Sequence, residues 1–193
     1  MMKKLPAVFL DRDGVINELI LNPATGEYEP PHSPDDLVLV YDVISSLCTL
    51  QDHGCALFLV SNQPDYAKGK TTLDQLRAVH ERLDYILKKN RIYFREYYYC
   101  YHHPQGIVPE YSIICQCRKP NPYFIFKAVR DYGIDLARSW MVGDRDSDIE
   151  CGHAAGIRTI LIHNPHSSGY QGSSHPEFVS ANLKEAVRLM IGV

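Results

Sequence analysis

The chain has 193 residues, the size of one globular domain, and its 45% hydrophobic and 22% charged residues exclude a disordered chain. Its formal net charge of −3 provides no basic field for nucleic acid, and no apolar run approaches the roughly 18 residues of a membrane span. We therefore expect a single domain over residues 1–193, with neither nucleic acid nor a membrane as a partner.

The N-terminus and the cysteines bear on the location of the protein. Residues 1–10 contain two lysines and a short apolar stretch broken by Pro6, which is unlike a signal peptide. Six cysteines without a sign of export favour reduced thiols or a metal site over disulfides. We expect a cytoplasmic protein that is a monomer.

Short apolar runs alternate with longer amphipathic segments along the chain. In chain order, we expect strands at 7–10, 56–60, 96–101, 140–142, 159–162 and 178–179. The helical spacing of apolar residues predicts helices at 42–53, 72–90, 122–132, 149–155 and 183–191, several of which end at a glycine. This alternation is typical of an α/β fold, a Rossmann-type parallel sheet flanked by helices.

Two stretches do not fit this alternation. Residues 17–36 contain Gly26 and four prolines, and we expect a long ordered loop there. Residues 163–176 are rich in serine, glycine and histidine and are expected to form a flexible surface loop. Long loops in compact domains often carry function, and a tolerated insertion is an equal alternative for the second stretch.

Three of the predicted strands end in polar residues: Asp11-Arg12-Asp13-Gly14, Ser61-Asn62-Gln63, and the run from Gly143 to Asp148. The carboxyl ends of parallel strands border the ligand site of an open sheet. Asp11 and Asp13 leave an extended chain on the same side, and Asp144 next to them would concentrate negative charge. A hard cation such as Mg²⁺ relieves this repulsion and also binds phosphate.

An aspartate beside Mg²⁺ and a phosphoryl group can act as a nucleophile and form an aspartyl-phosphate. A cation is still needed for the phosphate oxygens, and Arg118-Lys119 precedes a predicted helix. Each aspartate alone could be a solvated loop carboxylate or a helix cap, and Asp148 could simply lie in the first turn of its helix. The combination favours phosphoryl transfer.

The segments DRDGVIN, SNQ, RKP and GDRDSD resemble the four ordered motifs of the haloacid dehalogenase (HAD) superfamily of phosphatases. The resemblance implies a HAD-like fold without a large cap domain. It makes Asp11 the nucleophile and Asp13 the general acid and base, with Ser61 and Lys119 stabilising the phosphoryl group. It also implies a catalytic Mg²⁺ held by Asp11, the Asp13 carbonyl and Asp144, with Asp148 in support.

A second constellation lies between residues 100 and 117. Cys100, His102, Cys115 and Cys117 are three thiols and one imidazole, which suit a closed structural Zn²⁺ site. The loop between the two pairs has little to fold around, so a metal would supply its missing core. His103 is an alternative ligand, and three reduced cysteines without a metal are the alternative for the whole segment.

The segments CYHHPQG and CQCRKP resemble the zinc loop of the D-glycero-D-manno-heptose 1,7-bisphosphate phosphatases and the related histidinol-phosphate phosphatases. The resemblance implies that Cys100, His102, Cys115 and Cys117 bind the zinc. The expected activity is Mg²⁺-dependent hydrolysis of the C7 phosphate of this small phosphorylated sugar, in the synthesis of nucleotide-activated heptose for lipopolysaccharide or another surface glycan. Histidinol phosphate or another small sugar phosphate is the alternative substrate, and a zinc-dependent binding module is the alternative of a different class.

Four further residues are expected to contact the substrate: Asn62, Gln63, Arg118 and Arg145. A doubly phosphorylated sugar needs a second cationic subsite, which Arg118 and Arg145 could provide. A surface salt bridge is the alternative for Arg145. The chain departs from the resembled family at 64–69, where a sequence close to SGIARG is expected, and in its longer loop at 25–29. Both departures bear on the identity and anomer of the sugar.

Overall fold

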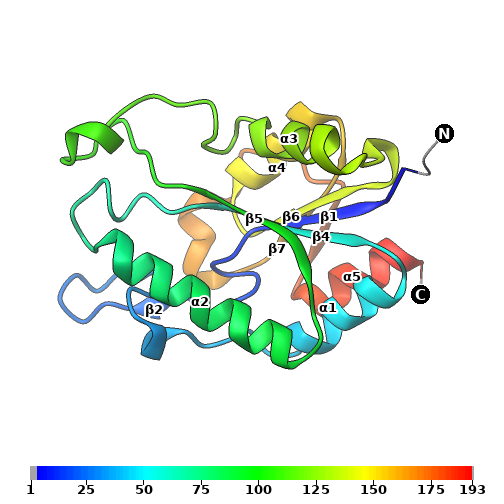
Figure 1. The fold of residues 1–193 in the computed structure, drawn as a ribbon, viewed down its shortest axis with the longest axis horizontal. Coiled ribbons are helices and arrows are strands. Elements are labelled where there is room, and N and C mark those ends of the chain that lie inside the picture. The colour runs from blue at the N-terminus through cyan, green and yellow to red at the C-terminus, as the bar shows by residue number, and fades with distance from the viewer. Residues whose placement is uncertain (1–3, 193) are drawn as a thin grey trace.

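A computed structural model describes residues 4–192, and a single parallel sheet runs through this range (Figure 1). Its strands lie in the order β5-β4-β1-β6-β7-β8, and every neighbouring pair is parallel. The bounds are β1 (Ala7–Leu10), β4 (Ala56–Asn62), β5 (Phe94–Cys100), β6 (Trp140–Gly143), β7 (Arg158–Ile162) and β8 (Phe178–Ser180). The predicted parallel α/β fold is confirmed. Residues 1–3 and 193, which belong to the predicted domain and N-terminal segment, lie outside the described range.

Helices cover both faces of the sheet, as Figure 1 shows. α1 (Val43–Asp52), α2 (Leu73–Lys89) and α5 (Leu183–Ile191) lie on one face, and α3 (Tyr123–Tyr132) and α4 (Asp146–Ala155) lie on the other. Successive residues of a strand point to opposite faces, so β1 serves both hydrophobic cores. Val8 and Leu10 pack with α1, α2 and α5, whereas Ala7 and Phe9 pack with α3 and α4.

The predicted helices are present, with one shifted start. The side chain of Thr72 accepts the N–H of Gln75 and caps α2, and Gly133 ends α3 in the left-handed conformation. α4 begins at Asp146, three residues before the expected Ile149. Apolar spacing does not detect this polar first turn, in which the Asp148 carboxylate accepts the N–H of Arg145.

The two irregular stretches are more structured than expected. Residues 17–36 contain a short antiparallel hairpin of β2 (Ile20–Leu21) and β3 (Tyr28–Glu29). Residues 163–176 lie at the surface as expected, but they contain a 3-10 helix, Pro165–Tyr170, whose Ser167 is fully buried, so the expectation of a loop is wrong for this part. The stretches meet where the rings of Tyr28 and His166 stack at 3.5 Å.

No helix found within residues 4–192 combines the length and the apolar character needed to cross a membrane.

Candidate active site and metal cluster

The topology of the sheet brings three predicted site residues together. β1 lies between β4 and β6, so Asp11, Ser61 and Asp144 stand at neighbouring strand ends. The register continues one residue beyond β1, where the N–H of Asp11 donates to the carbonyl of Val142 at 2.9 Å. The acidic residues are therefore held by the hydrophobic sheet itself.

Three carboxylates form a buried cluster at this edge. The carboxylate oxygens of Asp11, Asp144 and Asp148 lie within 4.8 Å of one another. Lys119 Nζ lies 2.9 Å from Asp11 Oδ1 and 2.6 Å from Asp148 Oδ1, and it donates to the carbonyl of Val60 at 2.6 Å. Burial alone would lower the pKa of Lys119, but the charges of the two aspartates outweigh it and the pKa is raised.

One lysine does not neutralise three carboxylates. Burial, and then the charges of Asp11 and Asp148, raise the pKa of Asp144 to about 8. Asp144 Oδ2 accepts a hydrogen bond from Ser167, while its buried Oδ1 has no hydrogen-bond partner within residues 4–192. A hard divalent cation fits this group, because it binds carboxylate oxygens and supplies the missing positive charge.

Two glycines allow the carboxylates to pack so closely. Gly14 has a φ of +81°, and a Cβ at this position would lie 2.2 Å from Asp144 Oδ2. A Cβ on Gly143 would lie 2.2 Å from the Cβ of Asp148. Any larger residue at either position would displace a carboxylate of the cluster.

Asp13 lies beside this cluster and is held by a separate set of donors. Arg12 donates to both of its carboxylate oxygens, Asn17 donates to Oδ1 and Gln63 donates to Oδ2. Gln63 and Ser61 are each only 1% exposed and are not among the residues that line the cavity, so the contact of Gln63 with the substrate stays a prediction. Its amide also donates to Ser61 Oγ at 2.9 Å, which makes it part of the support behind the site.

Sequence reasoning missed Arg12, Asn17 and Ser167. Arg12 and Asn17 lie inside the quoted DRDGVIN segment, and a signal for Arg12 existed, namely a charged residue at the end of a fully apolar strand. Ser167 had no signal, because only the tertiary structure brings residue 167 to Asp144.

A cavity of about 390 Å³ opens above the carboxylates. Asp11, Asp13, Asp148 and Lys119 lie on its lining, as does Asn62, whose amide makes two hydrogen bonds with the backbone of Lys119. Four further cationic side chains line the same cavity: Lys68, Lys70, Arg118 and Arg145.

Arg118 and Arg145 are close enough to affect each other. Burial is the main cause of a lowered pKa of Arg118, and the positive charge of Arg145 lowers it further. The Arg145 guanidinium lies 4.5 Å from the ring centre of Tyr170 and makes no salt bridge within residues 4–192, which disfavours the surface-pair alternative. The predicted pair of arginines therefore faces the cavity.

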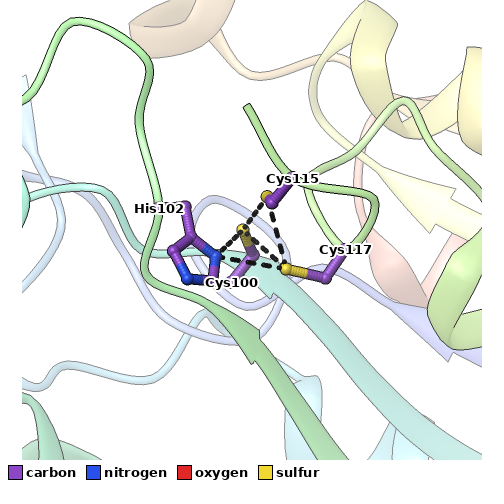
Figure 2. A group of neighbouring side chains, drawn as sticks. All are labelled: Cys100, His102, Cys115 and Cys117. Atoms are coloured by element: carbon purple, nitrogen blue, oxygen red, sulfur yellow. Dashed lines mark hydrogen bonds between the residues drawn. The ribbon is translucent and has the colours of Figure 1, made fainter. Parts of the chain in front are cut away.

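Figure 2 shows the second predicted constellation, in which Cys100, His102, Cys115 and Cys117 converge. The three sulfur atoms are 3.3, 3.4 and 3.5 Å apart, and Cys117 Sγ lies 3.4 Å from His102 Nδ1. Tetrahedral zinc with bonds of about 2.3 Å to sulfur places its sulfur ligands about 3.8 Å apart. The cluster could thus hold zinc with a small expansion.

The structure favours His102 over the alternative, His103. His103 Nδ1 accepts the N–H of Gln105 at 3.2 Å and is not a member of the cluster. The cluster also connects to the cavity, because Arg118 follows Cys117 and its guanidinium donates to the carbonyl of His102 at 3.3 Å. A metal here would order the segment that carries Arg118.

Comparisons with known proteins agree with this geometry. A family model described as HAD-hydrolase-like matches residues 116–186. A D-glycero-β-D-manno-heptose-1,7-bisphosphate 7-phosphatase from Escherichia coli (strain K12) is 39% identical over 163 residues, covering 84% of this chain and 81% of the relative. A D-glycero-α-D-manno-heptose-1,7-bisphosphate 7-phosphatase from Photorhabdus laumondii is 35% identical and covers 84% and 85% of the two chains.

A solved structure matches nearly the whole fold. The D,D-heptose 1,7-bisphosphate phosphatase from B. bronchiseptica, complexed with magnesium and phosphate, superposes with a TM-score of 0.80 and 25% identity. The match covers 97% of this chain and 99% of that one.

Proposed function

Because the chain belongs to the family of heptose-1,7-bisphosphate 7-phosphatases, which are HAD-type phosphoric monoester hydrolases, we propose that it removes the C7 phosphate of D-glycero-D-manno-heptose 1,7-bisphosphate. One observation carries the choice of substrate. A single cavity contains Asp11, Asp148 and Lys119 and also Arg118 and Arg145, which form no ion pair within residues 4–192 and could bind the second phosphate of the substrate. The relative with the higher identity is named for the β anomer, which we expect to be preferred.

The reaction begins with Asp11. An oxygen of its carboxylate attacks phosphorus, the bond from phosphorus to the C7 oxygen breaks, and Asp13 gives a proton to that oxygen. Water then attacks the phosphorus of the aspartyl-phosphate and passes a proton to Asp13, so that phosphate leaves and Asp11 is restored. In both steps Lys119 balances the charge of the phosphoryl oxygens, and the hydroxyl of Ser61 donates a hydrogen bond to them.

Asp11, the Asp13 carbonyl and Asp144 would hold Mg²⁺, with Asp148 in support. The bound ion would supply positive charge to the phosphoryl oxygens. Asp148 has a second role, because its carboxylate forms an ion pair with Lys119 at 2.6 Å and so orients the lysine. Zinc in the cysteine–histidine cluster would be structural and would hold the segment that presents Arg118.

The two alternative functions differ in the cavity that they require. Histidinol phosphate is cationic, and the cavity also contains acidic residues, of which Glu29 is paired with Lys70 and Asp65 with His32. Arg118 and Arg145, which form no ion pair within residues 4–192, disfavour this substrate. A function as a zinc-dependent binding module would not explain why the buried carboxylate–lysine cluster is present. We infer a cytoplasmic, monomeric enzyme of activated heptose synthesis for a surface glycan; the names of the relatives support the heptose bisphosphate substrate.

Phosphate release from a substrate panel tests the proposal. The panel contains both anomers of the heptose bisphosphate, histidinol phosphate and fructose 1,6-bisphosphate, with Mg²⁺ present. We expect the highest kcat/KM for the β heptose anomer. Faster release from histidinol phosphate would overturn the substrate and leave the mechanism intact.

The variant Arg118→Gln tests whether Arg118 binds the second phosphate of the substrate, the one that is not removed. Loss of a charged hydrogen bond to the second phosphate should raise KM for the bisphosphate about tenfold. The KM for heptose 7-phosphate, which lacks that group, should stay within about twofold of the wild-type value. An equal effect on both substrates would show that Arg118 does not bind the distal phosphate.

A further inference from the structure

Arg12 is a buried cation without a part in the proposed phosphoryl transfer. It lies between Asp11 and Asp13 in the chain and is only 1% exposed. Burying a guanidinium is costly unless its donors are satisfied. Here they are satisfied by the general acid of the proposed reaction.

The guanidinium of Arg12 donates hydrogen bonds to both carboxylate oxygens of Asp13. Arg12 Nε donates to Oδ1 at 2.9 Å, and an Nη donates to Oδ2 at 3.2 Å. The same Nη donates to Gln63 Oε1 at 2.8 Å, and the guanidinium carbon lies 5.9 Å from the ring centre of Tyr99. A planar fork with two bonds fixes the plane of a carboxylate, which a lysine cannot do.

Two further side chains donate hydrogen bonds to the Asp13 carboxylate. Asn17 Nδ2 donates to Oδ1 at 3.0 Å, and Gln63 Nε2 donates to Oδ2. Four donor groups thus bind the two oxygens and fix the orientation of the carboxylate. Gln63 is itself held in place, because its amide also donates to Ser61 Oγ at 2.9 Å.

From this geometry we propose that Arg12 is a positioning residue for proton transfer. Together with Gln63 it orients Asp13 toward the bond that breaks. This inference rests on the proposed function of Asp13. The proton moves from Asp13 to the leaving oxygen as the phosphorus–oxygen bond breaks, and water restores it as the aspartyl-phosphate is hydrolysed.

Substrates with different leaving groups separate positioning from folding. Nitrophenolate leaves without a proton, whereas the alkoxide of an alkyl phosphate needs one. The value of kcat/KM reports the steps up to the first release of product, so it isolates the transfer to Asp11. The substrates are p-nitrophenyl phosphate and the alkyl phosphate that the wild type hydrolyses fastest.

For Arg12→Lys we expect kcat/KM to fall roughly 10- to 100-fold on the alkyl phosphate, within the range of general acid catalysis. The loss on p-nitrophenyl phosphate should stay below about threefold. Gln63→Met should show the same pattern more weakly and serves if Arg12→Lys fails to fold. Asp13→Asn gives the upper limit of the difference.

The chain offers a matched control. Arg130 pairs with the next residue in the same way, with Nε 2.8 Å from Asp131 Oδ1, but on the exposed surface of α3. Arg130→Lys should leave both substrates unchanged. Equal losses on the two substrates for Arg12→Lys and Gln63→Met would overturn the proposal and assign both residues a purely structural role. Failure of the wild type on heptose bisphosphate alone would reject that substrate and leave this test valid.

Discussion

The carboxylate–lysine cluster and the cysteine–histidine cluster are both groups of four side chains, but the fold positions them differently. Asp11 and Asp144 extend from buried strands, and all four members of the first cluster are at most 7% exposed. In the second cluster only Cys100 lies on a strand, at the end of β5. The other three ligands lie in a loop in which Ile107 and Ile114 are 74% and 91% exposed.

This difference indicates what each cluster requires. The carboxylate–lysine cluster brings like charges together, and this costs folding free energy that the hydrophobic cores on both faces of the sheet must offset. The second has no core of its own, so its order depends on the ligands and on whatever binds them. A substitution in the first should therefore remove chemistry and keep the fold, whereas one in the second should loosen the loop.

The largest effect is expected for Asp11→Asn. Loss of a covalent nucleophile should lower kcat by a factor on the order of 10⁴ to 10⁶ for every substrate. The melting temperature of the metal-free protein should not fall, because the change removes one of three mutually repelling carboxylates. Steady-state kinetics and circular dichroism measure the two effects.

Glu150→Gln, on the exposed side of α4, is the control and should change neither quantity. Acid-quenched wild type should carry phosphate on the peptide that contains Asp11, and the variant should not. A variant that unfolds, or one that keeps more than about 1% of kcat, would contradict the view that the sheet alone holds this cluster.

A smaller and local effect is expected for Cys115→Ser. The variant should lose its bound zinc, measured by elemental analysis against one equivalent in the wild type. Proteases should cut between residues 101 and 117 while the sheet stays folded, because local order fails before the core does. KM for the bisphosphate should rise about tenfold through Arg118, as expected for the loss of one charged contact.

Cys48→Ser is the matched control, since Cys48 is half-buried on α1 and outside the cluster. It should keep zinc, protease resistance and KM. Global unfolding of Cys115→Ser would mean that the loop supports the sheet, and the contrast between the two clusters would then fail.

The same contrast explains how much could be predicted from the sequence. The strands, the helices and both clusters follow from apolar periodicity and from residues at strand ends, because parallel topology places those ends together. No local sequence pattern predicts the hydrogen bonds of Arg12 with Asp13 or of Ser167 with Asp144. The polar start of α4 was missed because apolar spacing detects only the part of a helix that packs.

The hairpin of β2 and β3 sharpens the comparison, because it too lacks a core of its own, and neither of the two possible metal clusters found in residues 4–192 includes a hairpin residue. Glu29 of the hairpin forms an ion pair with Lys70, and Tyr28 stacks on His166. Just after the hairpin, His32 Nε2 lies 2.8 Å from Asp65 Oδ2. The hydrogen bond to Asp65 is the main cause of a raised pKa of His32. Burial alone would raise the pKa of Asp65, but His32 lowers it.

The smallest effect is therefore a pH-dependent one, for His32→Gln. The raised pKa means that the histidine stabilises the folded state fully below pH of about 6.5, and that this contribution disappears as the pH rises through the folded pKa. At acid pH the ion pair is lost for a different reason: the contribution of Asp65 to stability disappears as the pH falls through its lowered pKa. Urea unfolding at pH 6 should show a loss of about 0.5–1 kcal/mol relative to wild type, which vanishes by pH 9. His53→Gln, an exposed histidine just beyond α1, should show no such difference, and a loss that persists at pH 9 would mean that His32 acts through packing rather than charge.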